Sequence, residues 1–338
     1  MRKSKARRLK TVGFVIAIAT ISLLALTFSA PKPATAFSAK VLRIEKGYTA
    51  GDVASLLRAE GLIRNRLVFQ IYLRVSGADR KLKAGTYKIV QGTSLPSLVA
   101  ALTQGKTLQI QVTIPEGSTA RAIARILDKA GICGQEDFLA AVGNSALTAR
   151  AGIPGATFEG FLFPDTYLFS ENSDAEMIAL AMAQTFFRKL GKILPGRKPD
   201  DKRLYEAVIL ASIVEREYGV EEEAGLIASV FKNRLAIDMA LQSCATVVYI
   251  ITEKQRKPHP KVVHYVDLEI DDPYNTYIHR GLPPGPISNP GETSLRAVFN
   301  SPESDYLYFR LIEDSEGLHK FSKTFQEHTG EAIPVKGF

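Results

Sequence analysis

The chain has 338 residues, 46% of them hydrophobic and 23% charged, which is the composition of a globular protein with about two domains. Its net charge of +8 does not indicate a nucleic-acid-binding protein, because six positive charges lie in the first ten residues and the remaining 328 residues carry only +2. The two cysteines, Cys133 and Cys244, lack the spacing of metal ligands, and both a disulfide and two separate thiols fit the sequence.

The N-terminus combines a basic segment with an apolar one. After the basic residues 1–10, residues 11–30 (TVGFVIAIATISLLALTFSA) form an uncharged run of the length that a helix needs to cross a bilayer. Because a basic flank stays cytoplasmic, the sequence predicts a cytoplasmic tail, a single-pass membrane anchor and an exported remainder. The alternative is a cleaved signal peptide, for which Ala34–Ala36 offers a small-residue cleavage site.

One pattern occurs twice after a short linker at residues 31–40. IEKGYTAGDVASLLRAEGL begins at Ile44, and IPEGSTARAIARILDKAGI begins 70 residues later and shares its Ile, Gly, Thr, Ala and Leu positions. A looser third copy is IVQGTSLPSLVAAL. Each copy predicts a strand that ends at a glycine and a helix capped by Thr49, Thr119 or Ser94. Such strand–helix units resemble LysM-like modules, which bind N-acetylated glycans, although a packing scaffold without ligand has the same pattern.

A long helix is predicted from about Lys202, and it leads into ILASIVEREYG (residues 209–219). On a helical wheel, Glu215 continues an apolar stripe with Val208 and Ala211 and lies near Ser212, whereas Glu217 points to nearly the opposite side. A carboxyl group in a partly apolar cleft has a raised pKa and can act as a general acid. A solvated helix end or half of a salt bridge is the alternative interpretation.

Polar side chains gather downstream of this helix. RLAIDMALQSCATVVY carries Gln242, and DDPYNTYIHRGLPPGPISNPG carries Asn275 and Tyr277 in a loop stiffened by proline. Amide and phenol groups on such a loop suit an uncharged polar substrate such as a sugar, although a rigid connector is equally compatible. Upstream, the aromatic segment FEGFLFPDTYLF contains Glu159 and Asp165.

Together, FEGFLFPDTY, ASIVERE, NRLAIDMALQS, TVVY, YNTY and GLPPGPISNPG resemble the endolytic murein transglycosylases, the YceG-like family. The family is bacterial and anchored in the cytoplasmic membrane. It cleaves within nascent peptidoglycan, near the synthetic machinery. The resemblance implies that Glu215 is catalytic. The chain departs from the family at LQSCATV, where many members have Asp-Pro in place of Cys244 and Ala245. The expected substrate-binding residues are Gln242, Asn275, Tyr277, Glu159 and Ser212.

The implied reaction needs a single carboxyl group. Glu215 would protonate the glycosidic oxygen between N-acetylmuramic acid and N-acetylglucosamine, and its carboxylate would then deprotonate the C6 hydroxyl to close a 1,6-anhydro ring. The resemblance implies no metal and no organic cofactor. Its implied partners are glycan strands, the cytoplasmic membrane and cell-wall synthases (penicillin-binding proteins), with no nucleic acid. The catalytic domain is expected on the extracytoplasmic face, where cleavage would end strand elongation.

Three alternatives remain open from the sequence. A hydrolytic muramidase would pair Glu215 with Glu159 or Asp165. Ser229–Lys232 (SVFK) matches the Ser-x-x-Lys pattern of penicillin-recognising acyl enzymes. A membrane-anchored scaffold would bind glycan without cleaving it.

The expected fold class is α+β: a single-pass N-terminal membrane helix, small LysM-like α/β modules, and a mixed α+β catalytic domain whose long helix carries the catalytic glutamate. The expected domains are the basic tail (1–10), the anchor (11–30), the linker (31–40), a LysM-like domain (41–107), a second repeat with a connecting region (108–200) and the catalytic domain (201–338).

Overall fold

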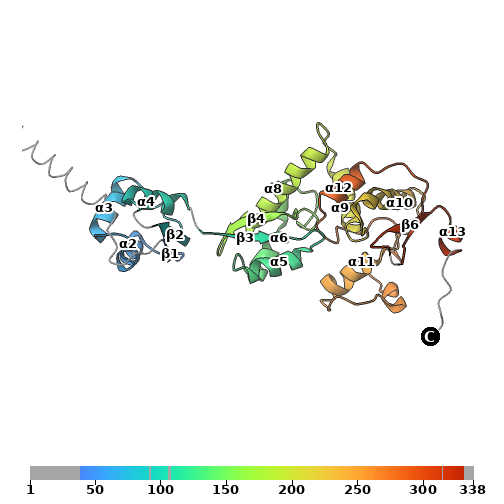
Figure 1. Cartoon of the computed structure of the whole chain (residues 1–338), viewed down its shortest axis with the longest axis horizontal. Coiled ribbons are helices and arrows are strands. Elements are labelled where there is room, and N and C mark those ends of the chain that lie inside the picture. The colour runs from blue at the N-terminus through green and yellow to red at the C-terminus, as the bar shows by residue number, and fades with distance from the viewer. Residues whose placement is uncertain (1–38, 91–92, 106–107, 314, 331–338) are drawn as a thin grey trace, which may run out of the picture. The chain divides into compact units, whose positions relative to one another are not determined.

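A computed structural model describes residues 39–90, 93–105, 108–313 and 315–330 (Figure 1). Helices alternate with three two-stranded sheets over these residues, which confirms the predicted α+β class. The described chain forms two compact units, one of residues 39–110 with 170–172 and one of residues 111–169 with 173–330. The predicted anchor at residues 11–30 lies outside the described residues. Within the described ranges, no helix is both long and apolar enough to span a bilayer.

The first unit packs three helices against an antiparallel strand pair. β1 pairs with β2, with Ala39 opposite Val90 and Ile44 opposite Gly85. Tyr87 from β2 is fully buried, and its hydroxyl donates to the Lys83 carbonyl (2.7 Å), so the centre of this small core has its polar group satisfied. The elements are β1 (Ala39–Ile44), α2 (Ala50–Ala59), α3 (Arg66–Val75), β2 (Gly85–Val90) and α4 (Leu95–Gln104).

The second unit contains the remaining elements (Figure 1). They are β3 (Gln109–Thr113), α5 (Ala120–Lys129), α6 (Gln135–Val142), α7 (Ser145–Ala151), β4 (Thr166–Ser170), α8 (Ala175–Ile193), α9 (Asp201–Val214), α10 (Ala224–Ala236), α11 (Cys244–Tyr249), α12 (Glu292–Phe299), β5 (Tyr308–Leu311), β6 (His319–Ser322) and α13 (Phe325–Thr329). Short 3-10 or π turns lie at residues 221–223, 250–254 and 265–269. This unit includes most of residues 108–200, the predicted second repeat and connecting region.

The repeated sequence pattern has the predicted local structure. Thr49, Ser94 and Thr119 each adopt an extended backbone at a helix N-cap, and each side chain accepts a hydrogen bond from a backbone N–H of the first turn. Gly47 and Gly117 have φ angles of 93° and 70°, which a side chain would disfavour, so the turn before the helix requires glycine in both full copies. One full copy lies in each unit.

α9 is the central helix of the second unit. Every residue from Val208 to Val214 is buried, since α10 and α12 pack against this helix. A helix that is apolar on all sides is typical of a protein interior. The single apolar stripe predicted from the sequence therefore accounts for only part of the buried surface of α9. The helix ends at Val214, so Glu215 is its C-cap residue and lies at the helix end rather than on one face.

Candidate active site

Glu215 lies where α9 meets the start of α12. Its carboxylate Oε2 accepts hydrogen bonds from the Gly291 N–H (2.9 Å) and the Ser294 hydroxyl (2.6 Å), and Oε1 accepts from the Tyr218 hydroxyl (3.3 Å). Gly291 is the N-cap of α12 and has no side chain with which to cap the helix, so Glu215 supplies an acceptor to its first turn.

The environment of Glu215 favours its protonated form. Partial burial raises the pKa of this carboxyl, and the neighbouring Glu116 carboxylate raises it further. The hydrogen bonds from Ser294, Gly291 and Tyr218 act in the opposite direction without cancelling the effect of burial. A carboxyl with a raised pKa and neutral donors at both oxygens can release a proton and then hold the resulting charge.

Glu116 is a residue of this site that the sequence analysis did not single out. Its carboxylate packs against Gly291, so closely that a Cβ at position 291 would overlap it. Burial of the carboxyl end raises the pKa of Glu116, and the charge of Glu221 raises it further. The glutamate belongs to the second repeat, in IPEGSTA, where its contact with α12 could not be recognised from local sequence.

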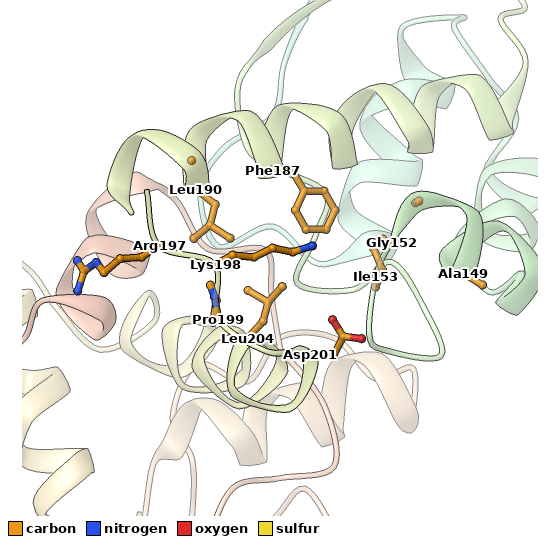
Figure 2. A pocket seen from close by; sticks show the side chains of 12 residues that line it. Ala149, Gly152, Ile153, Phe187, Leu190, Arg197, Lys198, Pro199, Asp201 and Leu204 are labelled. Atoms are coloured by element: carbon orange, nitrogen blue, oxygen red, sulfur yellow. The ribbon is translucent and has the colours of Figure 1, made fainter. Parts of the chain in front are cut away.

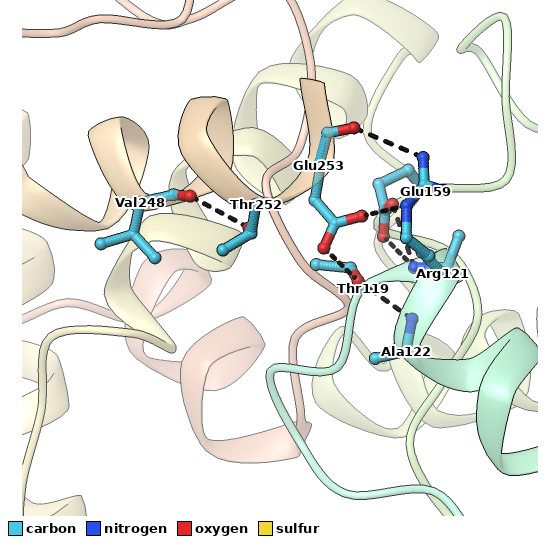
Figure 3. Close-up of polar contacts among 8 residues, drawn as sticks. Thr119, Arg121, Ala122, Glu159, Val248, Thr252 and Glu253 are labelled. Atoms are coloured by element: carbon cyan, nitrogen blue, oxygen red, sulfur yellow. Dashed lines mark hydrogen bonds and ion pairs between the residues drawn. The ribbon is translucent and has the colours of Figure 1, made fainter. Parts of the chain in front are cut away.

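Glu159 lies beside Arg121 and Glu253 at the start of α5 (Figure 3). Both of its carboxylate oxygens accept from the Ala120 N–H (3.0 and 3.1 Å) at the start of α5, and Oε1 also accepts from the Asn289 side-chain amide (2.8 Å). Burial raises the pKa of Glu159 to about 8, against the effect of these donors, and the nearby Glu253 contributes in the same direction. Glu253 itself binds Arg121 (3.0 Å), as Figure 3 shows. Glu159 is thus held by protein groups.

Gln242 and Tyr277 lie on two loops that are hydrogen-bonded together. The Gln242 N–H donates to the Thr276 carbonyl (3.1 Å), and the Gln242 side chain is exposed. Tyr277 is partly exposed, and its hydroxyl lies 2.9 Å from the Cys244 Sγ. Both side chains are open to a ligand, and their substrate-binding role stays a prediction. Cys133 is buried, and no disulfide joins it to Cys244.

Asn275 and Ser212 are fully buried and bind backbone groups. The Asn275 side-chain amide donates to the carbonyls of Leu268 and Ile270 (both 2.9 Å). The Ser212 hydroxyl accepts from the Ile287 N–H (3.0 Å) and thereby fixes the proline-rich loop to α9. The polar atoms of both residues thus bind backbone groups of the protein, whereas the sequence predicts that they contact substrate.

The Ser-x-x-Lys match does not form a nucleophile with its base. Ser229 is buried in α10, and its hydroxyl lies 2.7 Å from that of Ser304. Lys232 donates to the Val298 carbonyl (2.6 Å) and to Ser301 (2.8 Å) instead. The acyl-enzyme alternative therefore has no geometric support.

A cavity of about 580 Å³ opens elsewhere in the second unit, beside α8 and the start of α9 (Figure 2). Phe187, Leu190 and Leu204 give it an apolar lining, and Lys198 and Asp201 add charge. It contains none of the residues predicted for the site.

A partly buried glutamic acid with a raised pKa, held by uncharged donors, is the arrangement of enzymes that use a carboxyl group as proton donor. Comparison with known proteins gives the family: residues 42–332 match the model of the YceG-like family, and the chain belongs to it. This confirms the family resemblance of the sequence motifs.

Relatives with assigned names share much of the chain. It is 32% identical over 306 residues to an endolytic murein transglycosylase of Bacillus subtilis (strain 168), covering 85% of this chain and 82% of that protein. An endolytic murein transglycosylase of Streptococcus pneumoniae (strain D39) is 30% identical over 84% of this chain, which spans just over half (56%) of that protein. A crystal structure of a yceG-like protein from Listeria monocytogenes matches with a TM-score of 0.57 and 31% identity, covering 87% of this chain and 99% of that one.

Proposed function

We propose that this protein is an endolytic murein transglycosylase, a lyase that cleaves the β-1,4 bond between N-acetylmuramic acid and N-acetylglucosamine within peptidoglycan strands. The relatives support the reaction, and one structural observation supports the residue. The Glu215 carboxyl lies at the junction of α9 and α12, with burial raising its pKa and three neutral donors on its oxygens.

The geometry suits one residue that acts first as acid and then as base. Glu215 gives its proton to the glycosidic oxygen as the bond from that oxygen to C1 breaks, and the 2-acetamido carbonyl stabilises the positive C1. The new carboxylate is stabilised by the Gly291 N–H and the Ser294 hydroxyl. It then takes the proton of the muramyl C6 hydroxyl, whose oxygen bonds to C1. The product is a 1,6-anhydromuramyl end, and no water is consumed.

A hydrolytic muramidase is the second candidate, because Glu116 places another carboxylate next to the one at position 215. Such an enzyme needs a second carboxylate to activate water or to attack C1. Glu159 suits that role poorly, since protein donors occupy both of its oxygens and its pKa of about 8 keeps it largely neutral at pH 7.

Mass spectrometry of digested, uncrosslinked glycan strands tests the proposal. A transglycosylase leaves anhydro ends, each lighter by one water than the reducing ends left by a hydrolase. Glu215→Gln should reduce cleavage by about 10²–10⁴-fold while the protein stays folded, which is the usual contribution of a general acid. Reducing ends from the wild type would support the muramidase, uncut strands would support the non-catalytic scaffold, and full activity of Glu215→Gln would remove the assignment.

We also infer that the protein is anchored in the cytoplasmic membrane through residues 11–30, with its catalytic domain outside. Charge distribution supports a location at the membrane: residues 39–110 contain twelve Lys or Arg and four Asp or Glu, whereas residues 111–338 contain 24 and 31. The first unit is thus strongly basic, and anionic headgroups attract such a surface. On α3, Leu67, Ile71 and Val75 form an exposed apolar stripe (66%, 62% and 85% exposed) suited to the bilayer interface.

The alternation of strands and helices in residues 41–107 supports the proposal that this region is a LysM-like module. The partners that we expect beside nascent glycan strands are cell-wall synthases.

A further inference from the structure

Two carboxylates converge on the N-terminus of α12. Glu215 accepts from the Gly291 N–H (2.9 Å), and the N–H of the next residue, Glu292, acts to lower the pKa of Glu116. Glu116 also packs against Gly291, where a side chain on residue 291 would overlap its carboxylate. Gly291 therefore lies in contact with both acids: its N–H binds Glu215, and its Cα side packs against Glu116.

The backbone around Glu116 fixes its position. The Gly117 N–H donates to the Asn289 carbonyl, and the Asn289 N–H donates to the Ser118 carbonyl (both 3.0 Å). These reciprocal bonds hold the segment that carries Glu116 alongside the segment that leads into α12. Gly117 supports this approach because it has a φ of 70° and the Glu215 side chain lies 3.5 Å from the position of its absent Cβ.

The internal repeat shows that the strand–helix unit does not itself need a carboxylate here. The two copies share their Gly and Thr positions, and these residues perform the same turn and capping roles in both. At the position of Glu116, the first copy has Lys46, a residue of opposite charge. The carboxylate at 116 is therefore specific to the copy that contacts α12.

We propose that Glu116 is a positioning residue for the acid at position 215: its negative charge, held against Gly291, adds to the effect of burial and favours the proton-carrying form of Glu215. This inference rests on the proposed function of Glu215 as proton donor. Glu116 acts through Glu215 and needs no contact with the substrate.

The other charged groups around the pair leave this interaction intact. The Arg216 guanidinium donates to the Gly117 carbonyl (3.3 Å). Lys189 (3.3 Å) and Arg296 (2.7 Å) both bind the Glu292 carboxylate. The remaining titratable neighbours are Glu221, which faces Glu116, and the Tyr218 phenol, which donates to Glu215. Three cations thus lie near the pair, Arg216 on a backbone carbonyl and Lys189 and Arg296 on Glu292, whereas the charge of Glu221 acts in the same direction as that of Glu116.

Glu116→Gln tests the proposal through a pH profile. The free enzyme requires protonated Glu215, so kcat/KM falls as the pH rises through the pKa of this residue. Removing a charge several ångströms away in a partly screened site should lower that pKa, and so move the alkaline limb to lower pH by about 0.5–1 unit. On the acid side of the limb, kcat/KM should stay within about threefold of the wild type. Glu222→Gln is the control, because Glu222 is an exposed glutamate and its charge faces neither acid.

Gly291→Ala gives an independent perturbation that keeps both acidic residues in the sequence. The added methyl group must displace the Glu116 carboxylate, so the alkaline limb should shift in the same direction as in Glu116→Gln. Glu116→Ala vacates that space, and Gly291→Ala should then have little further effect on the limb. Such non-additivity is expected of two changes acting through one contact. Circular-dichroism melts would identify a variant that fails to fold.

A titration without substrate separates this inference from the proposed function. The full chain, labelled with ¹³C at the glutamate side-chain carboxyl, gives a Glu215 resonance that is assigned by its loss in Glu215→Gln. We expect its midpoint to be lower in Glu116→Gln than in the wild type and in Glu222→Gln. An unchanged midpoint overturns the role of Glu116, whatever the enzyme produces. A lowered midpoint in a protein that forms no anhydro ends upholds the contact and refutes the proposed reaction.

Discussion

Ser243 donates a hydrogen bond to the Glu217 carboxylate and so joins the turn after α9 to the start of α11. The Ser243 N–H in turn donates to the Thr276 hydroxyl (3.0 Å), beside Tyr277. Burial raises the pKa of Glu217, and the Ala245 N–H and His319 oppose this effect. Glu217 thus connects the helix that ends at Glu215 to both loops of the site.

A double-mutant cycle should measure this connection. Glu217→Ala leaves the buried Ser243 hydroxyl without its acceptor, and we expect it to lower the free energy of unfolding by about 1–3 kcal/mol. Ser243→Ala in the Glu217→Ala background should cost less than in the wild type, because the bond is already lost. Chemical denaturation gives all four values, and strictly additive losses would contradict the coupling.

Glu159 should make stability depend on pH. Its pKa of about 8 in the folded protein lies above the ordinary value of 4.5, so its favourable contribution is complete below pH 4.5 and is lost as the pH rises through 8. Glu159→Gln removes this dependence while keeping an acceptor for the Ala120 N–H. Between pH 5 and 8, the wild type should lose several kcal/mol more of unfolding free energy than the variant, at up to about 1.4 kcal/mol per pH unit. Parallel denaturation curves at all pH values would refute this assignment.

Ser294→Ala should shift the activity profile in the opposite direction to Glu116→Gln. The Ser294 hydroxyl donates to Glu215 (2.6 Å) and lowers its pKa, so its loss should move the alkaline limb of kcat/KM to higher pH. The maximal rate should fall about tenfold, because one donor to the carboxylate is lost. Ser288→Ala is the matched control, since the Ser288 hydroxyl is equally buried and donates to the Ser212 carbonyl (3.1 Å). A limb that moves to lower pH would contradict the argument.

Asn275 and Gln242 should respond differently to alanine. Asn275→Ala leaves two partly buried carbonyls without a donor, and we expect a loss of about 2–3 kcal/mol in the free energy of unfolding. Gln242→Ala removes an exposed side chain, so stability should change by less than about 0.5 kcal/mol. If Gln242 binds glycan, its variant should raise KM at unchanged stability. An unchanged KM would remove Gln242 from the substrate-binding residues.

The proposed membrane contact of α3 can be measured by tryptophan fluorescence. Because the chain contains no tryptophan, one introduced residue gives the whole tryptophan signal. In full-length protein reconstituted into vesicles containing phosphatidylglycerol, Ile71→Trp should show blue-shifted emission and quenching by brominated lipid. Ile237→Trp, at a 60% exposed position of the second unit, is the control and should show neither. Blue-shifted emission of Ile71→Trp that brominated lipid does not quench would indicate that a protein covers α3. Emission at the wavelength of a water-exposed tryptophan would refute any contact at α3.

Features encoded by neighbouring residues were predictable from the sequence. Thr49, Ser94 and Thr119 cap their helices as expected, because capping depends on residues only two or three positions apart. The start of α9 was placed within one residue. Glu116 was missed because its contact with Gly291 spans 175 positions, which no local pattern encodes. Side-chain direction was equally inaccessible: Asn275 and Ser212 suit a sugar by chemistry, yet backbone carbonyls and N–H groups use their polar atoms.

The backbone bonds that join Gly117 and Ser118 to Asn289 also tie the site to a late part of the chain. The acid, its companion carboxylate and the serine beside it come from three stretches of chain, and the last of these lies close to the C-terminus. During synthesis from the N-terminus, an unfinished polypeptide has the glutamate at 215 but lacks the helix start that holds it. A chain that ends before α12 should therefore lack both donors to the Oε2 atom of Glu215, the Gly291 N–H and the Ser294 hydroxyl.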